Sequence, residues 1–231
     1  MAYGEFAKIY DELINEDINY DSMVVRLKEI IDKYQSNPVD YLDLACGTGN
    51  IGVRMAKYFK STYAVDLSED MLREAFDKFK AERIKAKIIC QDMRELSLNH
   101  GDLEKYFTGV YEHLKDGGLF IFDINSFYKL TNILGNNIYT YSSEDVFYTW
   151  ENTIEDNVVN MFLTFFVKEK NELYERFEEE HFERAYEESE IEEVLNQVGF
   201  TLLGKFDGYN IDEVQQESER ILYVVGKNME V

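Results

Sequence analysis

A short apolar segment that runs directly into a glycine-rich loop constrains this chain more than any other feature. Residues 39–44 are predicted to form a buried strand, Gly47-Thr48-Gly49 follows, and apolar residues then recur at helical spacing as Ile51, Met55 and Phe59. Glycines let a backbone approach a ligand closely and adopt positive φ, and the first turn of a helix presents N–H groups that lack partners inside the helix. The sequence therefore predicts a strand–loop–helix unit that binds a ligand at its loop.

Strands and helices alternate on both sides of this unit. Helices are predicted over residues 3–14 and 20–34, further strands over residues 62–65, 86–90 and 119–124, and the connecting helices begin near Ser68 and Asp102. Such alternation is typical of parallel sheets covered by helices. We therefore expect an α/β fold with a doubly wound, mostly parallel sheet and helices on both faces.

A different pattern occupies residues 125–186. Three aromatic-rich strands are predicted at 146–150, 158–167 and 173–185, joined by polar turns. Consecutive strands with short turns favour a small antiparallel β insert. The α/β pattern returns afterwards with one helix and two closing strands. We expect residues 1–124 and 187–231 to form the ligand-binding domain, and residues 125–186 to form an acceptor or lid region beside it.

Two acidic residues follow the predicted second and third strands. Asp66 lies 17 residues beyond Gly49 at the end of one strand, and Asp92 follows the next. The carboxyl ends of parallel strands meet at one edge of the sheet, which is where open α/β sheets bind ligands. A carboxylate at the position of Asp66 can accept hydrogen bonds from both hydroxyls of a ribose.

The glycines at 47, 49 and 52 also match the G-x-G-x-x-G pattern of dinucleotide-binding proteins. Asp43, four residues before the first glycine, decides between the two kinds of ligand. A dinucleotide brings a pyrophosphate to this loop, which a nearby carboxylate would repel. S-adenosylmethionine brings an ammonium and a sulfonium, for which a carboxylate is a counter-ion. We therefore expect S-adenosylmethionine, with a nicotinamide-dependent oxidoreductase as the less favoured alternative.

The segments Leu42-Asp43-Leu44-Ala45-Cys46-Gly47-Thr48-Gly49-Asn50, Val65-Asp66-Leu67-Ser68 and Gln91-Asp92-Met93-Arg94 resemble the cofactor motifs of class I (Rossmann-like) methyltransferases. The resemblance covers nearly the whole chain and is greatest to small bacterial methyltransferases with an antiparallel insert. It implies that Asp43, Gly47 and Gly49 line the methionine end in the loop that also holds Ala45. It also implies that Asp66 holds the ribose, that Leu67 packs on the adenine with Asp92 and Met93 at its edge, and that Tyr10 helps to close the site.

One element of the family pattern is missing. A fourth strand is expected between Asp92 and the helix near Asp102, but Glu95-Leu96-Ser97-Leu98 leads through Asn99-His100-Gly101 straight into that helix. Either a stretch of roughly 15–20 residues has been omitted from the sequence, or the chain is a true deletion variant. The intact remainder of the pattern favours omission, and we expect a large spatial jump near residues 98–102. A true deletion would remove a wall of the site and suits a third alternative, a non-catalytic S-adenosylmethionine-binding protein.

The charge of the chain bears on its partners. A formal net charge of −22 repels phosphate backbones and disfavours nucleic acid as a partner. The sequence shows no secretory signal and no apolar stretch long enough to cross a membrane, so we expect a cytoplasmic protein whose two cysteines remain thiols.

The function expected from these features is methyl transfer from S-adenosylmethionine to a small-molecule acceptor by in-line displacement. Glu180-His181 in the insert is retained as a general-base hypothesis. Glu178-Glu179-Glu180 is interpreted as a solvated strand edge, and no metal-ligand spacing is present. The acceptor itself and the oligomeric state do not follow from the sequence.

Overall fold

The protein is described here by a computed structural model, which covers residues 11, 18–34, 38–91, 100–169, 173–210 and 212–229, with residues 100–102 described by their backbone alone. The predicted helix at 20–34 is present with those bounds as α2 (Tyr20–Tyr34). Of the helix predicted at 3–14, only Asp11 lies within the described residues, and it is helical.

The first half of the core is a parallel three-stranded sheet. Its strands are β1 (Asp40–Leu44), β2 (Ser61–Asp66) and β3 (Ala86–Cys90), in the order β1-β2-β3. Helices α3 (Asn50–Met55) and α4 (Glu69–Ala81) connect them, with the short 3-10 helix η1 (Ala56–Tyr58) after α3. Small residues such as Ala64 and Ala75, both fully buried, let α4 approach the sheet closely.

The second half is an antiparallel sheet of β4 (Leu119–Asn125), β10 (Arg220–Lys227) and β9 (Phe200–Asp207), in the order β4-β10-β9. Helices α5 (His100–His113) and α6 (Glu188–Val198) cover one face through an aromatic-rich cluster that includes Phe107, Phe120 and Tyr223. On the other face Ile30 of α2 packs against Leu222 and Val224. The predicted helices on both faces are therefore present around this half.

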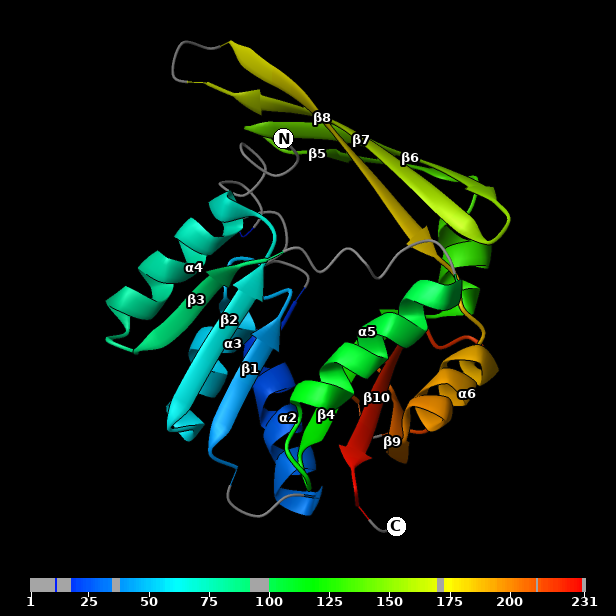
Figure 1. Ribbon diagram of the computed structural model, residues 1–231. Helices are drawn as coiled ribbons and strands as arrows, with labels where there is room; N and C mark the ends of the chain where they lie inside the picture. The colour runs from blue at the N-terminus through cyan, green and yellow to red at the C-terminus, as the bar shows by residue number, and fades with distance from the viewer. Residues whose placement is uncertain are drawn as a thin grey trace.

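The two halves do not form one sheet. Among the described residues β1 pairs only with β2 and β4 only with β10, and the second group of strands is antiparallel, so the α/β fold is present but the expected single, mostly parallel sheet is not confirmed. The free edges of β1 and β4 have no partner strand among the described residues, and the expected fourth strand would pair with both of them (Figure 1). Of the segment 98–102, where the spatial jump was expected, residues 98 and 99 lie outside the described residues, and residues 100–102 are helical at the start of α5. The omission therefore stays a prediction.

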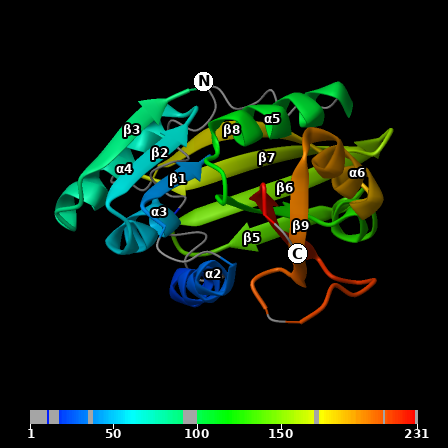
Figure 2. The same cartoon turned by 60° about the horizontal axis from the view of Figure 1, so that its bottom comes forward.

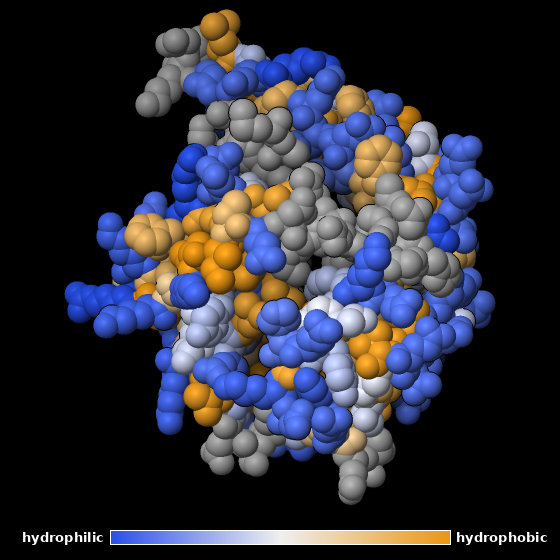
Figure 3. Space-filling view, in the orientation of Figure 1, coloured by the Kyte–Doolittle hydropathy of each residue, from blue (hydrophilic) through white to orange (hydrophobic). Residues whose placement is uncertain are grey.

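The free β1 edge retains exposed apolar side chains. Leu42 is 48% exposed, whereas Leu222 and Val224 on the central strand β10 are fully buried. Apolar surface also gathers over the half of the molecule that holds β2, β3 and α4, where Tyr63 and Phe76 are exposed (Figure 3). An interior strand of an α/β sheet normally buries both of its faces. The exposure of Leu42 is what the absence of a neighbouring strand predicts.

The insert region folds as an antiparallel sheet of β5 (Ile138–Ser142), β6 (Val146–Glu155), β7 (Val158–Lys168) and β8 (Tyr174–Arg184), in that order. The π-helix η2 (Lys129–Leu134) connects it to β4 and packs beneath it. Asp156 and Asn157 both have positive φ, which suits the two-residue turn between β6 and β7. The sheet lies across the end of the molecule at which β1 and β2 terminate (Figures 1 and 2).

The described residues contain no helix that is both long and apolar enough to span a bilayer.

Supplying the missing strand is expected to stabilise the fold. A cassette of about 18 residues with one apolar strand, inserted within residues 92–99, should raise the midpoint of thermal unfolding by about 5–10 °C. Burial of the β1 and β4 edges contributes several kcal/mol, and 1 kcal/mol moves the midpoint of such a chain by about 2–4 °C. Circular dichroism measures the midpoint. A Gly/Ser cassette of equal length is the control, and equal midpoints for the two cassettes would contradict the strand site.

Candidate functional site

The glycine-rich loop joins β1 to α3 in an unusual backbone conformation. Ala45, Gly47 and Gly49 all have positive φ, at 55°, 53° and 78°. A Cβ on Gly49 would lie 3.0 Å from Cβ of Ala75, so this glycine also lets α4 approach the loop. At Gly47, in contrast, no described atom lies within 4 Å of an added Cβ. The loop is therefore tightly packed at its second glycine and open at its first, where a ligand can approach the backbone.

Asp66 at the end of β2 fixes the loop in place. Its Oδ2 accepts a hydrogen bond from Gly47 N at 2.8 Å, and its Oδ1 accepts one from Ser68 N at 2.9 Å. Ser68 in turn caps α4, because its hydroxyl accepts a hydrogen bond from Met71 N. A carboxylate has about four acceptor positions, so Asp66 keeps one on each oxygen for a ligand hydroxyl.

Asp43 on β1 is the most electrostatically perturbed group of the loop. Its Oδ2 is buried with no hydrogen-bond partner among the described residues, and a Cβ on Gly52 would lie only 2.6 Å from it. Burial and the negative charge of Asp66 raise the pKa of Asp43 to about 7, although a hydrogen bond from Tyr41 opposes the shift. A cation beside this carboxyl would relieve that cost.

Cys46 is not a reactive thiol in this loop. Burial, with the charges of Asp43 and Asp66, raises the pKa of its thiol to about 12. The thiolate is the nucleophilic form of cysteine. The side chain therefore stays neutral, which agrees with a packing role.

Of the four remaining predicted residues, only Leu67 lies within the described part of the chain. Leu67 follows Asp66 directly and is half-buried, with its carbonyl oxygen accepting a hydrogen bond from the thiol of Cys90. Tyr10, Asp92 and Met93 lie outside the described residues. The structure thus brings together Asp43, Ala45, Gly47, Gly49, Asp66 and Leu67 at the carboxyl ends of β1 and β2.

Asp11 is a contact that the sequence reasoning did not identify. Its Oδ1 accepts hydrogen bonds from the hydroxyl of Thr48 (2.7 Å) and the amide of Asn50 (2.9 Å), while its Oδ2 pairs with Lys78 at 2.5 Å. Burial raises the pKa of Asp11, but these donors outweigh it and hold the pKa below its usual value. Asp11 is thereby attached to the glycine-rich loop, to the start of α3 and to α4. In the sequence, the polar residues Thr48 and Asn50 beside the glycines were the signal that this loop has a hydrogen-bonding partner.

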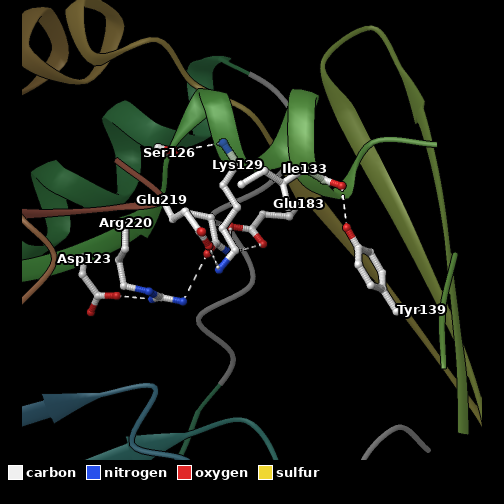
Figure 4. Close-up of polar contacts among 9 residues, drawn as sticks. Asp123, Ser126, Lys129, Ile133, Tyr139, Glu183, Glu219 and Arg220 are labelled. Carbon is white, nitrogen blue, oxygen red and sulfur yellow. Dashed lines mark hydrogen bonds and ion pairs between the residues drawn. The ribbon is translucent and has the colours of Figure 1, made fainter. Parts of the chain in front are cut away.

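A second polar group lies at the carboxyl end of β4. Arg220 donates hydrogen bonds to Asp123 and to Oδ1 of Asn125, and the hydroxyl of Tyr209 donates one to Asp123 Oδ1 at 2.8 Å. Figure 4 shows Arg220 reaching from β10 towards Glu183 of the β5–β8 sheet. Among the described residues no group of three or more His, Cys, Asp or Glu side chains could hold a metal ion.

Two surface hollows of about 460 and 490 Å³ lie elsewhere. One is between α6 and the 213–216 segment, and the other is beside α2 and Tyr209. Neither is lined by a residue of the glycine-rich loop. The loop contacts above, rather than these hollows, define the candidate site.

Known proteins share both the loop and the overall fold. A family model described as a methyltransferase domain matches residues 42–119. A provisionally named methyltransferase of Geobacillus sp. (strain WCH70) is 32% identical over 253 aligned positions, covering 98% of this chain and 100% of the relative. A solved S-adenosylmethionine-dependent methyltransferase from Clostridium acetobutylicum ATCC 824 is 42% identical, with a TM-score of 0.90 over 98% of this chain and 99% of its own.

The chain belongs to the S-adenosylmethionine-dependent methyltransferases. It is an enzyme of that family, and its cofactor is S-adenosylmethionine rather than a nicotinamide. An S-adenosylmethionine-bound amino pentose methyltransferase from Micromonospora echinaspora shares the fold at 14% identity, with a TM-score of 0.75 over 95% of this chain and 96% of its own. The donor set fits the cofactor, because the partnerless Oδ2 of Asp43 and the open face of Gly47 suit its cationic end.

The Geobacillus relative also bears on the missing strand. The alignment has 253 positions and this chain has 231 residues, so at least 22 positions of the relative face gaps in this chain. That excess, wherever it falls along the chain, equals the length of a strand with its connecting loops.

Removal of the Asp11 charge is expected to weaken cofactor binding. Asp11→Asn should raise the Kd for S-adenosylmethionine about tenfold, since a charge-assisted hydrogen bond contributes roughly 1.5–3 kcal/mol. Isothermal titration calorimetry measures the Kd. Asp21→Asn is the control, because it removes an equal charge from the exposed Asp21–Arg54 ion pair. Equal affinities for the two variants would show that Asp11 does not position the loop.

Proposed function

We propose that this methyltransferase transfers a methyl group to a small-molecule acceptor by in-line displacement. The single observation that carries the proposal is the pair of carboxyl groups, Asp43 at the end of β1 and Asp66 at the end of β2, beside a glycine-rich loop with an open face at Gly47. Similarity of fold to the amino pentose methyltransferase of Micromonospora echinaspora and to a sugar N-methyltransferase of Streptoalloteichus sp. supports an acceptor of small size.

Each residue of the site has a proposed role. The backbone of Ala45, Gly47 and Gly49, with the carboxyl of Asp43, holds the methionine end. Asp66 binds the ribose hydroxyls and Leu67 packs on the adenine. Asp92 and Met93 flank the edge of the adenine, and Tyr10 helps to close the site. These assignments follow the motif positions and, for Asp43 and Asp66, the hydrogen bonds and burial described above.

The protein's own contribution to the reaction is alignment and exclusion of water. S-adenosylmethionine, when bound, supplies a methyl group that is already activated by its sulfonium. The residues of the chain therefore need only to hold the acceptor atom in line with that methyl, and orientation alone can supply several kcal/mol. We propose that residues 125–186, which include the β5–β8 sheet, form the acceptor wall, because this sheet lies across the ends of β1 and β2 (Figure 2).

The raised pKa of Asp43 predicts that cofactor binding releases a proton. The pKa of about 7 means that Asp43 is mostly protonated in the free protein at pH 6. A bound cation favours the carboxylate, so the proton leaves, and affinity should rise with pH until it levels above pH 7. Calorimetry at pH 6 in buffers of different ionisation enthalpy should show release approaching one proton, and almost none at pH 8.5.

Asp43→Asn separates this explanation from a general effect of pH. The variant should bind S-adenosylmethionine more weakly at pH 8.5 and release no proton at pH 6. Its amide is the same size as the carboxyl, so packing against Gly52 is retained. Proton release that persists in the variant would assign the titration to another group and remove Asp43 from the proposed site.

A further inference from the structure

One face of β8 carries three titratable side chains in succession. Glu179, His181 and Glu183 occupy alternate positions, and alternate residues of a strand point to the same face. Glu179 is only 5% exposed, and the other two are half-buried. The side chains between and beside them are exposed on the opposite face: Glu178, Glu180 and Phe182. The expected solvated edge is therefore wrong for Glu179, and His181 does not share its face with Glu180.

The face that carries Glu183 is turned towards the core of the molecule. Glu183 pairs in register with Val159 of β7, which is fully buried against Leu130 and Leu134 of η2. The amide of Asn125, at the end of β4, donates hydrogen bonds to both carboxylate oxygens of Glu183, at 3.0 and 2.9 Å. The side chain of Glu183 thus extends from β8 to the carboxyl end of β4 (Figure 4).

A chain of hydrogen bonds runs from Glu183 through the end of β4 to Tyr209. Asn125 accepts a hydrogen bond from Arg220, and Arg220 is also bonded to Asp123. Asp123 accepts a hydrogen bond from Tyr209, whose hydroxyl is close enough to Asp43 for the carboxyl charge to raise its pKa. Hydrogen bonds therefore run from Glu183 as far as Tyr209, and the link from Tyr209 to Asp43 is electrostatic.

The charges along this path favour a cationic occupant. Burial raises the pKa of Glu183, and the nearby Asp123 adds to the shift, although Asn125, Arg220 and Lys129 oppose it. Arg220 is already engaged with Asp123, and Lys129 forms an ion pair with Glu219. A half-buried carboxylate with an amide as its hydrogen-bond donor gains from an added positive charge.

We propose that Glu183 binds the amino group of the methyl acceptor and takes a proton from it, so that the acceptors of this enzyme are basic amines. The inference rests on the proposed methyl transfer and names its substrate class. An ammonium acceptor gives one proton to Glu183 and regains its lone pair. The nitrogen then forms a bond to the methyl carbon, the carbon–sulfur bond breaks with its electron pair on sulfur, and Glu183 returns the proton to water.

Calorimetry on the protein loaded with S-adenosylhomocysteine tests the binding step without turnover. The probes are primary amines, each paired with the alcohol of the same carbon skeleton, such as glucosamine with glucose. Amines should bind at least tenfold more tightly than their alcohols. Glu183→Gln should abolish that preference, and Glu180→Gln, which removes an equal charge from the outer face of the same strand, should retain it. Glu183→Asp, which withdraws the carboxylate by one methylene, should give an intermediate preference.

Methyl transfer from labelled S-adenosylmethionine to the best-bound amine gives the second measurement. Glu183→Gln should lower the rate at least 100-fold, as expected for loss of a general base, with an unchanged Kd for S-adenosylmethionine. Equal binding of amines and alcohols, no binding of any amine, or a full rate in Glu183→Gln would overturn the inference. Failure of S-adenosylhomocysteine to bind would instead contradict the proposed function.

Discussion

The carboxylate of Asp66 is the contact on which the site depends. Through Gly47 N and Ser68 N it attaches the loop after β1 to the start of α4, so that two segments 21 residues apart share one anchor. A charge-assisted bond of this kind contributes roughly 1.5–3 kcal/mol. It also leaves acceptor positions on both oxygens at the edge where the strands end. The same group therefore shapes the loop and offers itself to a ligand.

The second constraint on the fold is that the described core strands form two separate three-stranded sheets. No strand lies between β1 and β4 among the described residues, and helix α2 contacts both halves: Leu27 packs with Met55 and Ile121, and Ile30 packs with Leu222 and Val224. The polar contacts from Asp123 to Glu183 then attach the β5–β8 sheet to β4. The site is thus built from elements that side chains hold together, where a continuous sheet would use backbone hydrogen bonds.

Local patterns in the sequence predicted much of this. The strands that became β1 to β4, helix α2 and the loop conformation follow from apolar periodicity and glycine positions, which act over a few residues. Strand β5 was missed because its side chains alternate between exposed and half-buried, with no fully buried position to give a strong apolar pattern. The break in the pattern before α5 predicts a missing fourth strand, and residues 92–99, where it would lie, are outside the described residues. A gap in the sheet was expected if that strand were deleted, and the described strands of the core do pair in two sheets instead of one.

The residues of the candidate site were likewise predicted only in part. Asp43 and Asp66 were predicted because motif spacing carries their positions. Asp11 and Glu183 were not, since each acts through residues 37 or more positions away that only the folded chain brings near. The burial of Glu179 among three consecutive glutamates depends on strand register, which composition does not reveal.

The most direct test of the account is calorimetric titration of the protein with S-adenosylmethionine, S-adenosylhomocysteine and NADH, on the wild type and on Asp66→Ala. The account predicts saturable binding of the two adenosyl ligands, no binding of NADH, and at least a tenfold loss of adenosyl affinity in a variant that remains folded by circular dichroism. Undiminished affinity in Asp66→Ala, or no adenosyl binding by folded wild type, would contradict the site described here.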